Sequence, residues 1–344
     1  MGIQGDREGW KRYDTRDSPF LELKNPFTTG ELVKTILMFP LLIVRTLLIV
    51  LALLVLAIMS FIAGLGWPLE EPMPAWRRNI VTASANCAGF VLMMLGFRLR
   101  VRGWENFAKA KELGVIGVFN HTAWVDAVAL MYLFAPSGVS KESNAHLPLV
   151  GTCIRSFQNI YVSRSSIELA KRREGVPSVA EKIARRARDR RFPMLVMAPE
   201  GTCGDGRCIL RFRTGAFVPG VPVLPICFRY NKRRINPAWT IINEGWHYVR
   251  MMSQISNALE VTVLPPYVPS EEERASPALY AQNVQELFCK TLGIPAIDQS
   301  QEEFSALVKL GVKVTWDGRR VIGPPGIVVD AGFVDLTPAM RKHE

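Results

Sequence analysis

Two polar side chains in the segment VFNHTAWVDAV (118–128) have the types and spacing of an acid–base pair, His121 and Asp126. An imidazole titrates near neutral pH and can take a proton from a hydroxyl group. On one straight helix this offset would place the two side chains on different faces, so they meet only if His121 precedes the helix and Asp126 lies in its first turn. The carboxylate would then fix the imidazole tautomer and raise its basicity. The pair alone also fits a loop histidine beside an aspartate that a helix dipole favours.

Other candidate residues precede or follow apolar runs. Glu200, Gly201 and Thr202 open the glycine-rich loop of APEGTCGDGRCILRFRTGAF, where Glu200 can accept hydrogen bonds from a polar head group or position a phosphate-binding arginine. Arg164, in NIYVSRSS, carries a planar guanidinium that suits phosphate recognition. Asn120 directly precedes His121. Taken singly, these residues also fit an ordinary turn and surface side chains.

Short apolar runs alternate with helical stretches after residue 102, which predicts an α/β fold with a mainly parallel sheet flanked by helices. Active sites in such sheets form at the carboxyl ends of strands. His121 follows one predicted strand and Glu200 another, so both are expected to face one crevice. Prolines in GVPVLPICFRY favour an edge or wall position for that strand. The predicted strands are 115–119, 158–162, 195–198, 221–228 and 261–264, and the predicted helices are 126–134 and 166–191.

The C-terminal part of the chain predicts packing elements only. Ser270 and Glu273 have the spacing of a capping box, and helically spaced apolar residues follow them. The tail from Val312 predicts irregular structure. The six cysteines are spread along the chain without the density of a disulfide scaffold, so we interpret them as free thiols or core residues, with metal binding the weaker alternative.

Residues 35–66 are almost wholly apolar, and the charge-free part from Thr46 to Gly66 would rise about 30 Å as a helix, enough to span a bilayer. A second charge-free segment, 79–97, is more polar and fits a second span, a re-entrant segment or a buried helix. Basic residues on both outer flanks favour a hairpin with both ends cytosolic. The expected divisions are a cytosolic segment 1–34, a membrane helix or hairpin 35–97, the soluble domain 98–310 and a tail 311–344.

Composition favours a membrane partner. The chain has 344 residues, 49% of them hydrophobic, and a formal net charge of +11. Charged residues make up only 21% of the chain, which excludes wholesale disorder. A basic excess favours a polyanionic neighbour, either nucleic acid or an anionic membrane face. Because long apolar runs accompany the charge, we predict the lipid bilayer as partner and no nucleic acid.

The order and spacing of these motifs resemble the glycerolipid acyltransferase superfamily (PlsC-like). An NHxxxxD motif comes first, then an arginine after a strand, then EGT, then a proline-containing apolar strand. HLPLVGTCIRSFQNIYVSRSS, PEGTCGDGRCILRFRTGAFVPGVPVLPICFRY and VTVLPPYVPSEEERASPALYAQNVQELF resemble its lysophosphatidylcholine acyltransferase branch more closely. The resemblance extends roughly from residue 100 to residue 310.

The resemblance implies a membrane-anchored, glycerol-phosphate acyltransferase-like fold and a specific reaction. His121 would be the general base that deprotonates the free hydroxyl of a lysophospholipid, and the oxygen would attack the thioester of acyl-CoA. Asp126 would orient His121, as in a catalytic triad whose nucleophile belongs to the substrate. No acyl-enzyme, metal or cofactor is implied, acyl-CoA being a co-substrate. The residues that would bind the head group are Arg164, Glu200, Gly201 and Thr202. Asn120, at the motif position before the histidine, would belong to the same substrate site through local hydrogen bonds.

Lysophosphatidylcholine is the first acceptor that the resemblance implies. Lysophosphatidic acid, lysophosphatidylethanolamine, or acetyl transfer to lyso-PAF are alternatives. A non-catalytic lipid-binding protein is a further alternative. A hydrolase is disfavoured, because the chain lacks the GxSxG motif that carries a hydrolase nucleophile. Members of the branch often carry EF-hand-like segments, but no calcium-loop pattern is present here, so no calcium binding is predicted. The terminal RKHE resembles a dibasic retrieval signal, which favours the endoplasmic reticulum membrane with the domain on the cytosolic side.

Overall fold

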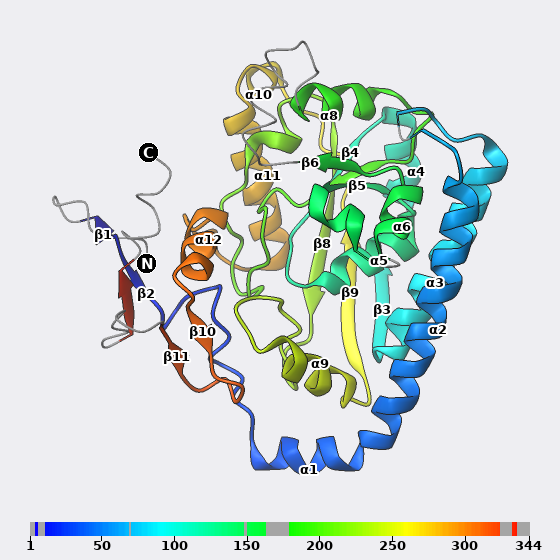
Figure 1. The fold of residues 1–344 in the computed structure, drawn as a ribbon. Helices are drawn as coiled ribbons and strands as arrows, with labels where there is room; N and C mark the ends of the chain where they lie inside the picture. The colour runs from blue at the N-terminus through cyan, green and yellow to red at the C-terminus, as the bar shows by residue number, and fades with distance from the viewer. Residues whose placement is uncertain are drawn as a thin grey trace.

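The computed structural model describes residues 4–5, 11–68, 70–147, 150–162, 179–323 and 332–335. Its centre is a sheet of seven strands in the order β3-β9-β8-β4-β7-β5-β6 (Figure 1). All neighbouring strands in this sheet are parallel except β8 and β9. The predicted α/β fold with a mainly parallel sheet is therefore confirmed. The strands are β3 (Phe97–Arg102), β4 (Ile116–Phe119), β5 (Ser137–Lys141), β6 (Ile160–Val162), β7 (Leu195–Met197), β8 (Val223–Tyr230) and β9 (Asn257–Val263).

Sequence patterns missed two strands, β3 and β5, and misplaced a third. In β3 the arginines alternate with apolar residues and leave one face of an edge strand exposed, which hides the apolar signal. The strand β5, SGVSK, has too few apolar residues to stand out. Of the edge or wall position expected for the proline-containing strand, the edge alternative was wrong, because β8 lies between β9 and β4. Pro225 is tolerated there because it lies where the β8–β9 ladder ends and its carbonyl still accepts from Leu264 N at 2.9 Å.

Two hydrophobic clusters cover the two faces of the sheet. On one face, apolar residues from α3 (Ala75–Met94), α4 (Glu105–Leu113), α5 (Trp124–Phe134) and α9 (Glu244–Met252) pack on β4, β8 and β9. On the other face, α8 (Val179–Arg188) and α11 (Pro277–Leu292) pack on β4, β7 and β8. The central strands are thus buried on both sides, which explains their continuous apolar runs. The remaining helices are α1 (Thr29–Leu37), α2 (Phe39–Gly64), α6 (Val150–Ser156), α10 (Glu271–Ala275) and α12 (Gln301–Lys309), with short 3-10 turns η1 (Glu142–His146) and η2 (Thr214–Ala216).

The predicted capping box at Ser270 is confirmed at the start of α10. Glu273 N donates to Ser270 Oγ at 3.2 Å, and Ser270 N donates to Glu273 Oε2 at 2.7 Å. The predicted helix after it follows as α11, which supplies a buried stripe to the core.

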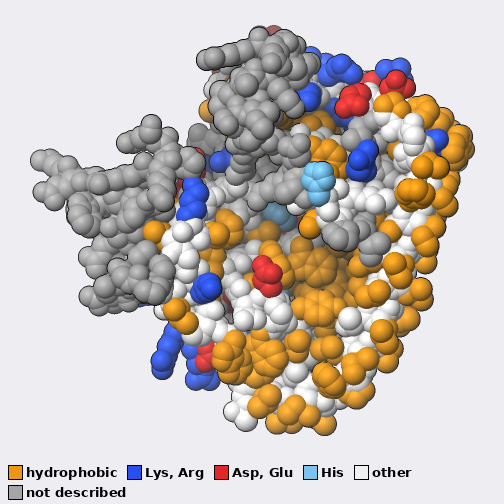
Figure 2. All heavy atoms as spheres, in the orientation of Figure 1, with side chains coloured by type: hydrophobic (Ala, Val, Ile, Leu, Met, Phe, Trp, Pro, Cys, Tyr) orange, Lys and Arg blue, Asp and Glu red, His pale blue; other side chains and the backbone are white. Residues whose placement is uncertain are grey.

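The helix α2 is long and apolar enough to cross a membrane, with a mean hydropathy of 3.0 in its most apolar window, of which 22% is buried. It runs antiparallel to α3 along one side of the domain, and α1 lies across its beginning (Figure 1). Apolar side chains gather along this side and around α1 (Figure 2). Arg45, the charged residue of α2, donates to the carbonyl oxygens of Met252 (2.8 Å), Gln254 (2.6 Å) and Ile255 (3.1 Å). Its charge is thereby used to attach α2 to the end of α9.

Residues before α2 pack against residues far beyond α3. Leu21 forms a β-bridge with Ile241, and Phe20 and Leu21 belong to one buried cluster with residues of α12. The tail is less irregular than predicted, because β12 (Phe333–Asp335) pairs with β2 (Lys11–Asp14), which pairs with β1 (Gln4–Gly5), while β10 (Lys313–Val314) pairs with β11 (Val321–Ile322). The residues before α2 and those after α3 therefore pack together in one body.

Candidate active site

The structure brings His121 and Asp126 together in the predicted way. His121 lies in the loop between β4 and α5, and Asp126 lies in the first turn of α5. His121 Nδ1 is 2.9 Å from Asp126 Oδ2. The Asp126 side chain is fully buried, whereas 23% of the His121 side chain is exposed. The imidazole can therefore meet a ligand while its aspartate stays out of water.

Four donors surround the Asp126 carboxylate. Oδ2 accepts from the backbone N–H groups of Thr122 at 2.7 Å and Ala123 at 2.9 Å, in addition to its contact with His121. Oδ1 accepts from the hydroxyl of Tyr230, at the carboxyl end of β8. Because a carboxylate oxygen faces Nδ1 of His121 at 2.9 Å, Nδ1 carries the hydrogen and Nε2 is left to accept a proton.

The surroundings of His121 favour a strong base. Burial lowers the pKa of the imidazole, but Cys203 and the Asp126 carboxylate raise it, and the net pKa lies well above its ordinary value. Burial, together with the Asp126 charge, raises the pKa of Tyr230 well above its usual range. Tyr230 therefore remains a neutral phenol that donates to Asp126.

Glu200 lies beneath the His121 loop. Its Oε1 accepts from His121 N at 2.7 Å and its Oε2 accepts from Leu210 N at 2.9 Å. Burial raises the pKa of Glu200 to about 7. Both oxygens are engaged by backbone groups, so the contacts seen are those of a positioning residue that ties the EGT loop to His121. Direct contact between Glu200 and a head group stays a prediction.

Basic side chains border the EGT loop. Gly201 has a φ of +71°, and a Cβ there would lie 3.3 Å from Arg213 Cδ, so Arg213 packs directly over this glycine. A Cβ on Gly206 would lie 2.8 Å from Lys232 Nζ and 3.1 Å from Thr122 Oγ1. Thr202 is almost buried, with 9% of its surface exposed. The loop therefore brings two cations close to the imidazole loop.

Asn120 has the local role that its position suggested. Its Nδ2 donates to Phe228 O at 3.0 Å, and its Oδ1 accepts from Phe228 N at 2.7 Å. These bonds join the chain after β4 to β8 and fix where the His121 loop starts. Arg164 lies outside the described residues.

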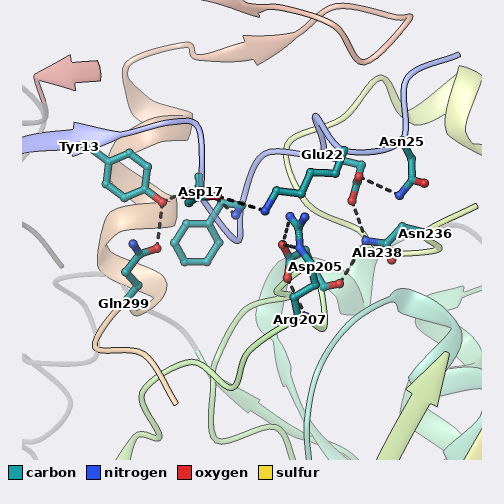
Figure 3. A network of polar contacts seen from close by, with 12 residues as sticks. Tyr13, Asp17, Glu22, Asn25, Asp205, Arg207, Asn236, Ala238 and Gln299 are labelled. Atoms are coloured by element: carbon teal, nitrogen blue, oxygen red, sulfur yellow. Dashed lines mark hydrogen bonds and ion pairs between the residues drawn. The ribbon is translucent and has the colours of Figure 1, made fainter. Parts of the chain in front are cut away.

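The N-terminal segment braces the loop after the EGT motif (Figure 3). Glu22 Oε2 accepts from Asn236 Nδ2 at 2.6 Å, and the same nitrogen donates to Asp205 O at 3.1 Å. Asp205 in turn accepts from Arg207 N at 2.8 Å. The side chains of Glu22, Asp205 and Asn236 are buried. Residues that precede the apolar helix α2 therefore help to shape the catalytic side of the domain.

Sequence reasoning missed Tyr230, Arg213 and Lys232. A signal for Tyr230 existed, because it stands at the carboxyl end of a strand adjacent to β4, where active-site residues gather. Within the described residues, no group of three or more His, Cys, Asp or Glu side chains could hold a metal ion.

Comparisons with known proteins place the chain beside acyltransferases. Residues 98–229 match the model of the Acyltransferase family. The chain is 30% identical over 306 residues to lysophosphatidylcholine acyltransferase 2 from Homo sapiens, covering 87% of this chain and 52% of the relative. It is 34% identical over 297 residues to lysophosphatidylcholine acyltransferase 1 from Danio rerio, covering 83% and 55%. The chain thus spans about half the length of these relatives.

A solved structure also aligns with the fold. It is the crystal structure of the 1-acyl-sn-glycerophosphate (LPA) acyltransferase PlsC from Thermotoga maritima, with a TM-score of 0.49, 18% identity, and coverage of 73% of this chain and 94% of that one. The motif order, the His121–Asp126 geometry and the family match over residues 98–229 show that this chain carries a PlsC-like acyltransferase domain of the glycerolipid acyltransferase superfamily, similar to the lysophosphatidylcholine acyltransferases.

Proposed function

We propose that the protein is an acyl-CoA-dependent lysophospholipid acyltransferase that re-acylates lysophosphatidylcholine. The observation that carries the proposal is the contact of 2.9 Å between His121 Nδ1 and a buried Asp126 carboxylate, on a domain of the acyltransferase family. The similarity to proteins named lysophosphatidylcholine acyltransferases supports the choice of acceptor.

In the proposed reaction, Nε2 of His121 takes the proton from the free hydroxyl of the lysophospholipid. The oxygen attacks the thioester carbonyl, an ester C–O bond forms and the C–S bond breaks. The CoA thiolate then leaves and receives the proton from the imidazolium. Asp126 holds the imidazole in the required tautomer and stabilises its charged form. Because the nucleophile belongs to the substrate, no acyl-enzyme forms.

The basic groups around the EGT loop suit the phosphate of the acceptor. Arg213 and Lys232 flank the loop, and we assign Arg164, Gly201 and Thr202 to the same head-group site, with Asn120 and Glu200 shaping it. A guanidinium and an ammonium group recognise phosphate by charge-assisted hydrogen bonds. Lysophosphatidic acid and lysophosphatidylethanolamine share this phosphate and are the alternative acceptors.

We further propose an integral membrane location through α2, in the endoplasmic reticulum, with the catalytic domain on the cytosolic side. Long acyl chains on both substrates favour a site at the bilayer surface. The apolar α2, with its exposed side chains along one side of the domain, supports a membrane anchor, and the packing of Phe20 and Leu21 on the domain keeps the chain before α2 on the side of the domain. Protease protection of tagged chains in microsomes tests this arrangement, since protection of both termini would contradict a cytosolic domain.

The decisive assay compares purified wild-type protein with His121→Ala in detergent, using acyl-CoA with each of the three lysophospholipids. The variant should lose roughly 10²–10⁴-fold in rate, because a positioned base contributes that much. His146→Ala is the matched control, since His146 is exposed and has no role in the proposed reaction. Equal CoA release by wild type and His121→Ala with every acceptor would instead favour a non-catalytic lipid-binding protein.

A further inference from the structure

A cavity lies at the end of the sheet opposite to His121, where the parallel strands begin. It has a volume of about 630 Å³, and residues just before β4 and β7, such as Val115 and Met194, line it. His121 follows the carboxyl end of β4, whereas this cavity borders the amino ends of the same parallel strands. The chemistry proposed for His121 therefore gives this cavity no role.

The cavity carries an excess of positive charge. Arg78 from the first turns of α3, Lys111 from the last turn of α4, and Arg190 after α8 all line it. Within the described residues, none of these three has a hydrogen bond or ion pair to an acidic group. The one acidic side chain in the lining, Asp189, is bound by Arg191 at 2.8 Å. The positive charges of the lining outnumber this one carboxylate, and an excess of cations in a concave site attracts an anion.

Two of the four lining cations have partners within the wall: the ammonium of Lys111 lies over the Phe107 ring, 4.6 Å from its centroid, and Arg186 is bound to the backbone. Arg186 Nη1 donates to Gln158 O at 2.8 Å, and its guanidinium stacks on Phe192 at 3.8 Å from the ring centroid. Arg190 is held close to the wall, because a Cβ on Gly114 would lie 3.4 Å from its Nε. Gly114 ends α4 with a φ of +69°, a left-handed conformation that favours glycine, and the absence of a Cβ leaves room for Arg190.

The rest of the wall suits hydrocarbon. Trp104 stacks on Phe134 with ring centroids 5.4 Å apart, and Phe107 packs on Phe134 at 4.7 Å. Val81 and Thr82 of α3 line the opposite wall, and α3 packs against the apolar α2. Trp104 and Tyr132 remain 46% and 42% exposed in the lining. Such aromatic side chains are typical of the boundary between lipid and water.

We propose that this cavity binds a membrane glycerophospholipid with an anionic head group, at a site separate from the catalytic one. The head-group phosphate would lie among Arg78, Lys111 and Arg190, and the chains would follow the aromatic and α3 walls toward the bilayer. A soluble phosphate compound shares the anionic chemistry but has no chain for the apolar wall. Binding of the protein to a membrane would then depend on the surface charge of that membrane. This dependence would be the same for every lysophospholipid that the protein acylates.

The test measures binding of dioleoyl phosphatidylserine, doped into neutral detergent micelles, to the full chain by native mass spectrometry. Arg78→Gln/Arg190→Gln should weaken binding about 30-fold, since each basic residue near a lipid phosphate contributes roughly a factor of five. Arg98→Gln/Arg100→Gln removes the same charge from the exposed face of β3 and should stay within about twofold. Thr82 is exposed and lines the cavity, so a tryptophan in its place fills the cavity without changing its charge. Thr82→Trp should therefore also abolish binding of phosphatidylserine.

Competition identifies the ligand. Inorganic phosphate and CoA should not displace phosphatidylserine. Displacement by either would assign the cavity to a soluble phosphate compound and overturn the lipid assignment. Unchanged lipid affinity in Thr82→Trp, or equal losses in the two arginine pairs, would overturn the site itself. Because Thr82→Trp leaves every charge in place, the result stands even if the Arg78 and Arg190 variant fails to fold.

Discussion

Replacing Asp126 by asparagine should separate the charge of the carboxylate from its geometry. An amide oxygen in the position of Oδ2 can still accept from Thr122 N, Ala123 N and His121 Nδ1, contacts of 2.7, 2.9 and 2.9 Å in the wild type. The amide N–H₂ would then face the Tyr230 oxygen, which can accept. The opposite orientation would aim donors at two buried N–H groups, so it is disfavoured. Asp126→Asn should therefore keep the loop and the imidazole tautomer.

The expected loss follows from the charge alone. A carboxylate beside an imidazole raises its pKa by about 1–3 units. Each unit by which the imidazole pKa falls lowers the rate of proton abstraction by at most a factor of ten. Asp126→Asn should therefore lose about 10- to 1000-fold in kcat. Asp126→Ala should lose as much as His121→Ala, and it should also unfold more easily by about 1–3 kcal/mol for each N–H left unsatisfied.

The pH profile distinguishes this mechanism from a merely structural one. A general base works deprotonated, so activity falls as the pH drops through the pKa of His121, which lies well above its ordinary value. Without the carboxylate that pKa falls, so in Asp126→Asn the acidic limb of kcat/KM should move to lower pH while the plateau drops. Asp298→Asn, whose carboxylate pairs with Arg211 on the surface, is the matched control. A limb that stays at the wild-type pH would refute the role given to the Asp126 charge.

Three further predictions concern residues around the site. The pKa of Glu200 is about 7 in the folded chain and near 4.5 in the unfolded chain, so the free energy of unfolding should fall by about 3 kcal/mol between pH 4.5 and pH 7. In Glu200→Gln, the melting temperature should fall less steeply with pH over this range than in wild type. Asn120→Ala leaves the N–H and C=O of Phe228 without partners and should destabilise the chain by about 2–4 kcal/mol in denaturant unfolding, an effect absent if water replaces the amide. Arg45→Met removes the donors to three carbonyls after α9, so limited proteolysis should cut near Ile255 faster than in wild type, with unchanged cutting arguing against the anchor.

The fold class and the paired motifs were predictable because they depend on local patterns. Buried strands flanked by His121 and Glu200 stand out as apolar runs, and the carboxyl-end rule for parallel sheets then places both residues at one edge. The strand β3 was not predictable, since its arginines face solvent on an edge strand. The expectation that Glu200 faces the ligand rested on residue type, which does not reveal that both carboxylate oxygens accept from backbone N–H groups.

Contacts between distant segments were beyond sequence reasoning for a different reason. Glu22 and Asn236 meet at 2.6 Å across 214 positions of chain, and neither sits in a motif. A similar case is Tyr230, whose hydroxyl reaches Asp126 only because β8 lies next to β4. Such pairs depend on strand order, which alternating patterns of strands and helices leave open.

These long-range contacts indicate that the segment before α2 supports the loops around His121. Glu22 is buried and bonded to Asn236, which also holds the backbone of Asp205 in the loop after the EGT motif. Loss of a buried hydrogen-bond partner lowers the free energy of unfolding by about 1–3 kcal/mol. Here the loss would destabilise the loop in which Gly204 N donates to His121 O at 2.9 Å. Removing the residues before α2 should therefore disturb the loop that holds the His121 imidazole. The segment before α2 is part of the folded domain, because its buried Glu22 is connected through Asn236 and the 204–205 backbone to the His121 loop.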